Sequence, residues 1–379
     1  MAQAVGVEGG SSRLEALLGY LDSDPDNLSL TASAATAAFE EGRLDVASTL
    51  VDRYGEQAPL PAELKNLRGL VALSSHRFDL AAAQFEALLP ERPDDAGLRF
   101  NLAWSKAMLQ DYAGAAELID QAVIAAVPHA AALKVQALHH LGRLEEALKD
   151  GRAAAERFPQ DTGLMGSLSA VSIDAGDVDL AAVYAKKAGD APDGLATLGM
   201  LELGRANLAA AARQFDQALN IQADHARALL GRGLVRLAAG DPEAAIPDID
   251  RSATLFGNHL GSWLAAGWAR LGVGDIAGAR RTIEKALAID DTFSETHGAL
   301  AVLDVMQRRD ADAKRRIDVA LRLDRSCFSA ALAQVLLLQA QGKTASADRI
   351  TSAALNTPVG PSGRTMGEAL ADFGRLRKS

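Results

Sequence analysis

The chain has 379 residues and a formal net charge of −10; 49% of its residues are hydrophobic and only 4% are aromatic. Alanine and leucine supply most of the apolar content, which is typical of closely packed helices and predicts an all-α fold. The acidic balance argues against a nucleic-acid partner, because phosphate contacts need a surplus of Lys and Arg on one face. The single cysteine, Cys327, argues against a disulfide framework and against a zinc site built on thiols.

Residues 1–27 are predicted to form an N-terminal segment with one short helix. The helix is expected from Ser12 to Leu21, where Ser12 and Glu15 have capping-box spacing. The first dozen residues lack the basic start and the apolar stretch of a signal peptide, and no uncharged run in the chain is long enough to cross a bilayer. We therefore expect a cytoplasmic protein without membrane insertion.

An internal repeat organises residues 28–358. Ten alanines recur at intervals of 34, 34, 32, 34, 30, 34, 34, 34 and 34 residues. They are Ala47, Ala81, Ala115, Ala147, Ala181, Ala211, Ala245, Ala279, Ala313 and Ala347. A period of this length indicates a small unit that cannot bury its own apolar face and is stacked until its neighbours bury it. In such an array we expect function to lie on an extended surface, not in an enclosed pocket.

Each unit has the pattern of a helix, a turn and a second helix. In the unit that starts at Ala226, leucines recur at helical spacing, Gly240-Asp241-Pro242 interrupts them, and the second helix ends at Gly257. The turn position recurs in register, and glycine fills six of the ten places, which suits the left-handed conformation that closes a helix. These places are Gly42, His76, Gln110, Gly142, Gly176, Ala206, Gly240, Gly274, Arg308 and Gly342.

Small residues also recur on the first helix, where the two helices of a unit are expected to approach closely. The pattern of Gly69, Phe78, Ala81, Phe85 and Pro93 within one unit resembles that of the tetratricopeptide repeat family. The resemblance covers about ten units. It implies a right-handed α-solenoid, a superhelix of antiparallel helix pairs in which the first helices line a concave groove. It does not by itself name a ligand.

Two intervals depart from the period. The spacing falls to 32 residues before Ala147 and to 30 before Ala211, and the second loss lies near a cluster of helix breakers in residues 189–194. This pattern predicts a kink or a shortened helix there, and it makes residues 189–194 the candidate boundary between two segments of the array. Residues 359–379 are expected to form a C-terminal tail, in which Met366 to Arg377 is a candidate short helix that caps the last repeat or occupies the groove.

No motif supports an enzyme or a cofactor. Gly342-Lys343-Thr344 lacks the earlier glycine of a phosphate-binding loop and follows a predicted helix instead of a strand. Three histidines lie close together in the sequence, but no ligand at a spacing of three or four residues accompanies them, so we expect a polar groove lining and no metal site. They are His129, His139 and His140. The stretch from Arg280 to Arg325 holds ten bases and nine acids, which is typical of a solvated helix surface with ion pairs.

The groove implied by the resemblance gives the candidate site. Large aromatics and a pliable Met beside amide and imidazole groups suit the apolar side chains and the backbone of a partner. The residues expected to bind protein are Phe100, Asn101, Trp104, Met108, Gln136, His139, His140, Met200 and Trp268. For Phe100 and Trp104, packing between adjacent units is an equal alternative. Trp263 and Trp268 point to different sides of one helix, and we expect Trp263 in the core and Trp268 in the groove.

The leading interpretation is a non-catalytic interaction module, an adaptor or assembly scaffold that holds an extended or helical segment of another protein. Two alternatives stay open. One is a regulatory solenoid that senses a peptide, a lipid or another small ligand, and the other is an accessory subunit of a separate enzyme. The sequence names neither the partner nor the oligomeric state.

Overall fold

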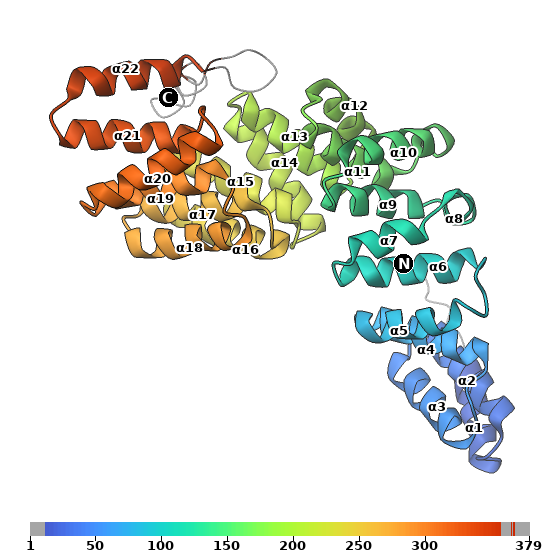
Figure 1. Cartoon of the computed structure of the whole chain (residues 1–379). Coiled ribbons are helices and arrows are strands. Elements are labelled where there is room, and N and C mark those ends of the chain that lie inside the picture. Colours follow the sequence, from blue (N-terminus) through green and yellow to red (C-terminus); the bar gives the residue numbers. More distant parts are fainter. Residues whose placement is uncertain (1–11, 358–364, 366, 368–379) are drawn as a thin grey trace, which may run out of the picture. The chain divides into compact units, whose positions relative to one another are not determined.

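The computed structural model describes residues 12–357 together with Thr365 and Gly367 (Figure 1). The described residues form 22 α-helices joined by short connections, and the chain divides into two compact units, Met1–Pro159 and Gln160–Ser379. Within this described part, no helix has both the length and the apolar content that a membrane crossing requires.

Two series of helices make up the units. Those of the first unit are α1 (Arg13–Ser23), α2 (Leu28–Glu40), α3 (Leu44–Gln57), α4 (Ala62–Ser74), α5 (Phe78–Leu88), α6 (Ala96–Met108), α7 (Tyr112–Leu118), α8 (Gln121–Ala126), α9 (Ala130–His140) and α10 (Leu144–Arg157). Those of the second unit are α11 (Thr162–Asp174), α12 (Val178–Ala188), α13 (Pro192–Gly204), α14 (Leu208–Ile221), α15 (Ala226–Ala239), α16 (Pro242–Phe256), α17 (Leu260–Gly272), α18 (Ile276–Ile289), α19 (Ser294–Met306), α20 (Asp310–Leu323), α21 (Phe328–Ala340) and α22 (Thr344–Leu355).

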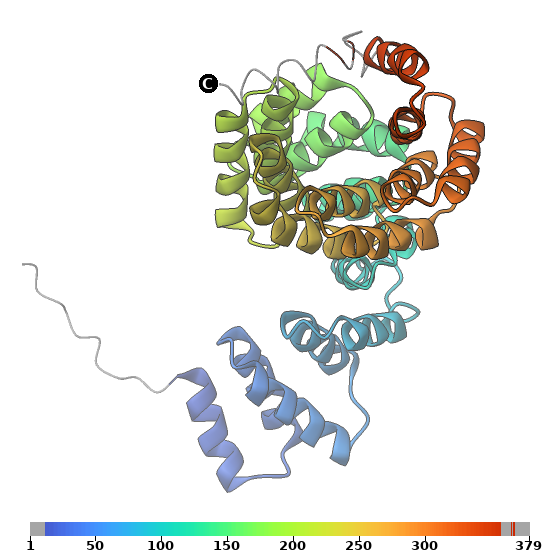
Figure 2. The ribbon, with the colours of Figure 1, turned by 90° about the vertical axis from the view of Figure 1, so that its left-hand side faces the viewer.

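The helices pair into ten hairpins, from α2 and α3 to α21 and α22, which confirms the predicted helical solenoid. The helix α1 precedes the first hairpin and packs on α2, and both hydrogen bonds of the capping box between Ser12 and Glu15 are present. In the second unit, successive hairpins follow one another along a curve, from yellow-green through gold and orange to red in Figure 2.

The buried small residues explain why the helices of a hairpin approach closely. All ten periodic alanines have no exposed surface. A Cβ atom added at Gly69 would lie 2.5 Å from the ring of Phe85, and one added at Gly233 would lie 2.3 Å from Cγ1 of Ile249. Because such distances are far below van der Waals contact, each glycine makes room for a bulky side chain of the second helix.

Every predicted turn residue adopts the left-handed conformation. The six glycines have φ between 70° and 85°, and His76, Gln110, Ala206 and Arg308 have φ between 57° and 64°. The N–H group that follows the turn donates to the carbonyl five residues earlier, as from Asp241 to Arg236 at 2.9 Å. This bond satisfies one of the free carbonyl groups at the end of the first helix, so the turn closes the helix even where glycine is absent.

Replacing Gln110 by glycine should stabilise the first unit by about 1 kcal/mol, because only glycine adopts this conformation without steric cost. The matched change of Gln110 to alanine keeps the steric cost and should leave the stability within about 0.5 kcal/mol of the original. Urea unfolding followed by circular dichroism measures both. Equal midpoints for the glycine and alanine variants would contradict the assignment of strain to this turn.

The third hairpin holds a break that the sequence analysis did not predict. Its second helix, α7, ends at Leu118, and Asp120 begins the short helix α8 by accepting hydrogen bonds from the N–H groups of Ala122 (3.0 Å) and Val123 (2.9 Å). An aspartate that caps these N–H groups replaces the backbone bonds that a continuous helix would make there.

The boundary between the compact units does not coincide with the predicted cluster of breakers. The division falls at Pro159, directly after α10, where proline cannot prolong the helix. In residues 189–194, α12 ends at Ala188, Gly189 has φ of 59°, and α13 begins at Pro192 within the second unit. The candidate helix from Met366 to Arg377 lies outside the described residues.

Candidate functional site

The helix α6 is fixed in place by capping and by one lysine. Asp95 caps its first turn by accepting from the N–H of Leu98 (3.0 Å). Near its end, Nζ of Lys106 lies 2.7 Å from a carboxylate oxygen of Glu86 in α5 and 3.2 Å from one of Asp111, which caps α7. The bond to Glu86 raises the pKa of Lys106 above its usual value, so the lysine stays charged and ties three helices together.

An apolar ridge runs along α6. The ring of Phe100 is buried, and its centroid lies 5.7 Å from that of Trp104 in an edge-to-face contact. Trp104 and Met108 follow at helical spacing and are 42% and 48% exposed. Because large apolar side chains are usually covered, their exposure at adjacent turns of one helix marks a surface that a partner could cover.

The helix α9 lies alongside α6, with α7 packed against both. At its start, the ring of His129 contacts Phe100 edge to face at 4.6 Å. At its end, His140 stacks on Tyr112 of α7, with the rings 4.2 Å apart and 6° from parallel. Residues near the two N-termini meet, and the end of α9 meets the start of α7, which closely follows the end of α6. The helices α6 and α9 therefore run in the same direction, which places Met108 and His140 toward the same end of the pair.

We define the α6–α9 surface as seven of the predicted residues: Phe100, Asn101, Trp104, Met108, Gln136, His139 and His140. Of these, Phe100 is buried, Asn101 and His139 are half-buried, and Gln136 and His140 are exposed. Sequence reasoning missed Tyr112, whose burial raises its pKa, and two exposed leucines at the ends of α6 and α9, Leu109 and Leu141. Both leucines directly precede a predicted turn residue, and this recurring position could have identified them from the sequence.

The other two predicted residues lie in the second unit. Met200 is half-buried and packs against the hydrophobic cluster around Phe215. Trp268 is half-buried and packs against two hydrophobic clusters, whereas Trp263 donates from Nε1 to the carbonyl of Gly257 (2.8 Å) and lies beneath Nζ of Lys285, 4.7 Å from its ring centre. Both tryptophans are half-buried, and Trp268, not Trp263, is the one that packs against the hydrophobic clusters.

The register of α17 explains the packing of Trp268. Gly267 faces Ile283 of the same hairpin, where an added Cβ would lie 2.4 Å from Cγ1. The next residue along the helix is turned by about 100° and therefore points toward the neighbouring hairpin.

The first unit also contains a cavity of about 750 Å³ at the junction of the first and second hairpins. Its lining is mixed: Arg68, Arg77, Asp45 and Asp52 accompany apolar residues such as Leu44. No binding motif in the sequence marks these residues, so the cavity was not predictable from the sequence.

The described residues contain no group of three or more His, Cys, Asp or Glu side chains that could hold a metal ion. Cys327 is buried at the start of α21, and burial raises the pKa of its thiol to about 11. It is therefore a neutral thiol near pH 7 and not an activated nucleophile.

The sequence matches a known protein family. The tetratricopeptide repeat model matches residues 32–96, 66–131, 100–162 and 196–258, which together make up about half of the chain. No curated protein sequence matches the chain.

Two solved structures resemble the fold over most of the chain. A chain of the APC/C hetero-tetramer Cut9–Hcn1 is 15% identical, with 85% of each chain covered and a TM-score of 0.51. A monomeric mutant of IFIT1 with m7Gppp-AAAA is 11% identical, with 90% of this chain and 94% of that chain covered and a TM-score of 0.53. At these identities the likeness concerns the fold alone.

Proposed function

Because the chain belongs to the tetratricopeptide repeat family, we propose that it is a non-catalytic interaction module that holds a segment of another protein on the α6–α9 surface. The observation that carries this proposal is the half-exposed pair of Trp104 and Met108. The ring of Trp104 stands on the buried ring of Phe100, which the exposed ring of His129 contacts edge to face. Exposed aromatic and thioether groups on a rigid helix bind apolar side chains with little loss of conformational entropy.

The polar members of the surface support a peptide as the ligand. Asn101, Gln136 and His139 carry groups that can exchange hydrogen bonds with a backbone, while the ridge takes the side chains. Residues 1–159 hold 23 acids and only 14 bases. This charge favours a partner segment that combines bulky apolar residues with Lys or Arg, because opposite charge accelerates association and selects among partners.

The acidic charge of residues 1–159 disfavours a nucleic-acid ligand, although the IFIT1 structure contains m7Gppp-AAAA.

We further propose that the chain acts as a scaffold or adaptor in the cytoplasm. A single cysteine in 379 residues supports a reducing compartment.

Photo-cross-linking from the full chain in its native cells tests the proposed surface. A benzophenone amino acid at position 104 should trap a protein partner, because this position is expected to lie under the bound segment. The control is the same amino acid at Tyr20, an aromatic residue of α1 that is 63% exposed. Products at both positions alike, or none at position 104, would count against the surface.

A further inference from the structure

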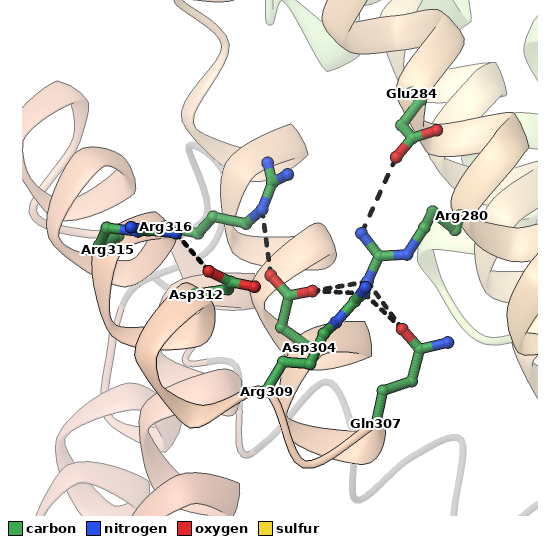
Figure 3. Close-up of polar contacts among 8 residues, drawn as sticks. All are labelled: Arg280, Glu284, Asp304, Gln307, Arg309, Asp312, Arg315 and Arg316. Carbon is green, nitrogen blue, oxygen red and sulfur yellow. Dashed lines mark hydrogen bonds and ion pairs between the residues drawn. The ribbon is translucent and has the colours of Figure 1, made fainter.

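A buried carboxylate in the second unit is surrounded by three arginines (Figure 3). The side chain of Asp304 in α19 is 2% exposed. Its Oδ1 accepts hydrogen bonds from Nη2 of Arg280 in α18 (2.6 Å) and from Nη2 of Arg309, directly before α20 (2.7 Å). Its Oδ2 lies 3.1 Å from Nε of Arg316 in α20, in an ion pair without hydrogen-bond geometry. Asp304 therefore forms ion pairs, as the sequence predicted for this stretch, but it is buried instead of lying on a solvated surface.

The cluster carries more positive than negative charge. One carboxylate neutralises one guanidinium group, and three guanidinium groups surround Asp304. Glu284 offsets the positive charge of Arg280 only weakly, since its nearest oxygen is 3.8 Å from the guanidinium group and its side chain is half-exposed. Partial burial reduces screening by water, so the remaining charge attracts an anion more strongly than the same charge at an open surface would.

The arginines also keep unused hydrogen-bond donors. The buried Nε–H of Arg280 has no acceptor, and among the described residues the only polar contact of Arg316 runs through its Nε. In Figure 3 the terminal nitrogens of Arg316 lie on the side away from Asp304. Gln307 accepts from both Arg280 and Arg309, which holds these two guanidinium groups side by side. The side chains of Arg309 and Arg316 are 42% and 30% exposed, so a ligand can reach them.

We propose that Arg280, Arg309 and Arg316 form a binding site for an oxyanion of the phosphate-monoester class. The guanidinium charge that Asp304 leaves over attracts an anion, and the terminal oxygens of a phosphate monoester fit the planar fork of arginine, which binds phosphate through paired hydrogen bonds. The contacts to Asp304 and Gln307 hold the guanidinium groups before the ligand arrives, which lowers the entropic cost of binding. The site lies in the second unit and does not depend on the α6–α9 surface.

Titration of the full chain with inorganic phosphate, followed by ³¹P NMR at constant ionic strength in chloride, tests the site. We expect saturable binding that Arg316→Gln and Arg309→Gln each weaken about tenfold or more, because each removes charge-assisted hydrogen bonds. The matched control is Arg315→Gln, which changes the same charge on the same helix, at a side chain that is 78% exposed and pairs with Asp312. It should leave the affinity within about twofold.

Two results would overturn the proposal: the absence of saturable binding in the original chain, or an equal loss in the Arg315→Gln control, which would indicate unspecific attraction. Circular dichroism of each variant shows whether the fold is kept, and the Arg309 and Arg316 variants report independently if one of them does not fold. A parallel titration with N-acetyl-phosphoserine amide identifies the source of the anion. Tighter binding than inorganic phosphate supports a phosphorylated side chain, and weaker binding supports a free phosphate.

Discussion

Replacing Gly233 by alanine is expected to destabilise the second unit by about 3 kcal/mol, although the change adds a single methyl group. The added Cβ would lie 2.3 Å from Cγ1 of Ile249, a side chain that is completely buried between the two helices of its hairpin. Ile249 cannot move away without disturbing the neighbouring hairpin, since protein interiors are closely packed. The urea midpoint, followed by circular dichroism, measures the loss.

Gly204→Ala is the matched control, because Gly204 also lies in a first helix of the second unit and an added Cβ would meet no atom within 4 Å. It should leave the stability unchanged or raise it by up to about 1 kcal/mol, as alanine favours helix over glycine. Combining Gly233→Ala with Ile249→Ala should cost less than the sum of the two separate losses, because the smaller side chain at position 249 leaves room for the added methyl group. Equal midpoints for the Gly233 and Gly204 variants would contradict the account, because they would show that the close contact between Gly233 and Ile249 does not determine the stability of the unit.

The features that recur in every hairpin were predictable from the sequence. The periodic alanines are buried because each of them solves the same packing problem, and the turn residues are left-handed even at His76 and Gln110, where the residue type gives no hint. In these two cases the register, counted from neighbouring units, carried the prediction. Such features depend on residues close in sequence, so one chain contains ten copies of the signal.

Features that occur once were not predictable. The break before Asp120 depends on a single capping side chain, and the burial of Asp304 depends on Arg280, which lies 24 residues earlier on another helix. Counting acids and bases between Arg280 and Arg325 could not show which of them meet, since charges on different helices pair only after the helices pack. The orientation of Trp268 likewise follows from the close contact of Gly267, whose partner is known only from the structure.

Truncating Trp104 and His140 together to alanine should weaken the binding of the cross-linked partner at least about tenfold, because exposed aromatic groups on a rigid base are the usual hot spots of an interface. The change removes the apolar surface that Trp104 offers to a partner, and it removes the stack of His140 on Tyr112, which positions the end of α9. The helical content should remain, since both side chains are exposed. A simultaneous loss of helicity would instead indicate a role in packing.

The affinity of the identified partner segment for three full-length chains tests the central claim most directly. The chains are the original, the Trp104 and His140 double variant, and a control double variant with alanine at Tyr20 and His76, an exposed aromatic residue and an exposed histidine of the same unit. Calorimetric titration should show a loss of affinity for the Trp104 and His140 variant alone. Equal affinity for all three chains would contradict a binding site on the α6–α9 surface.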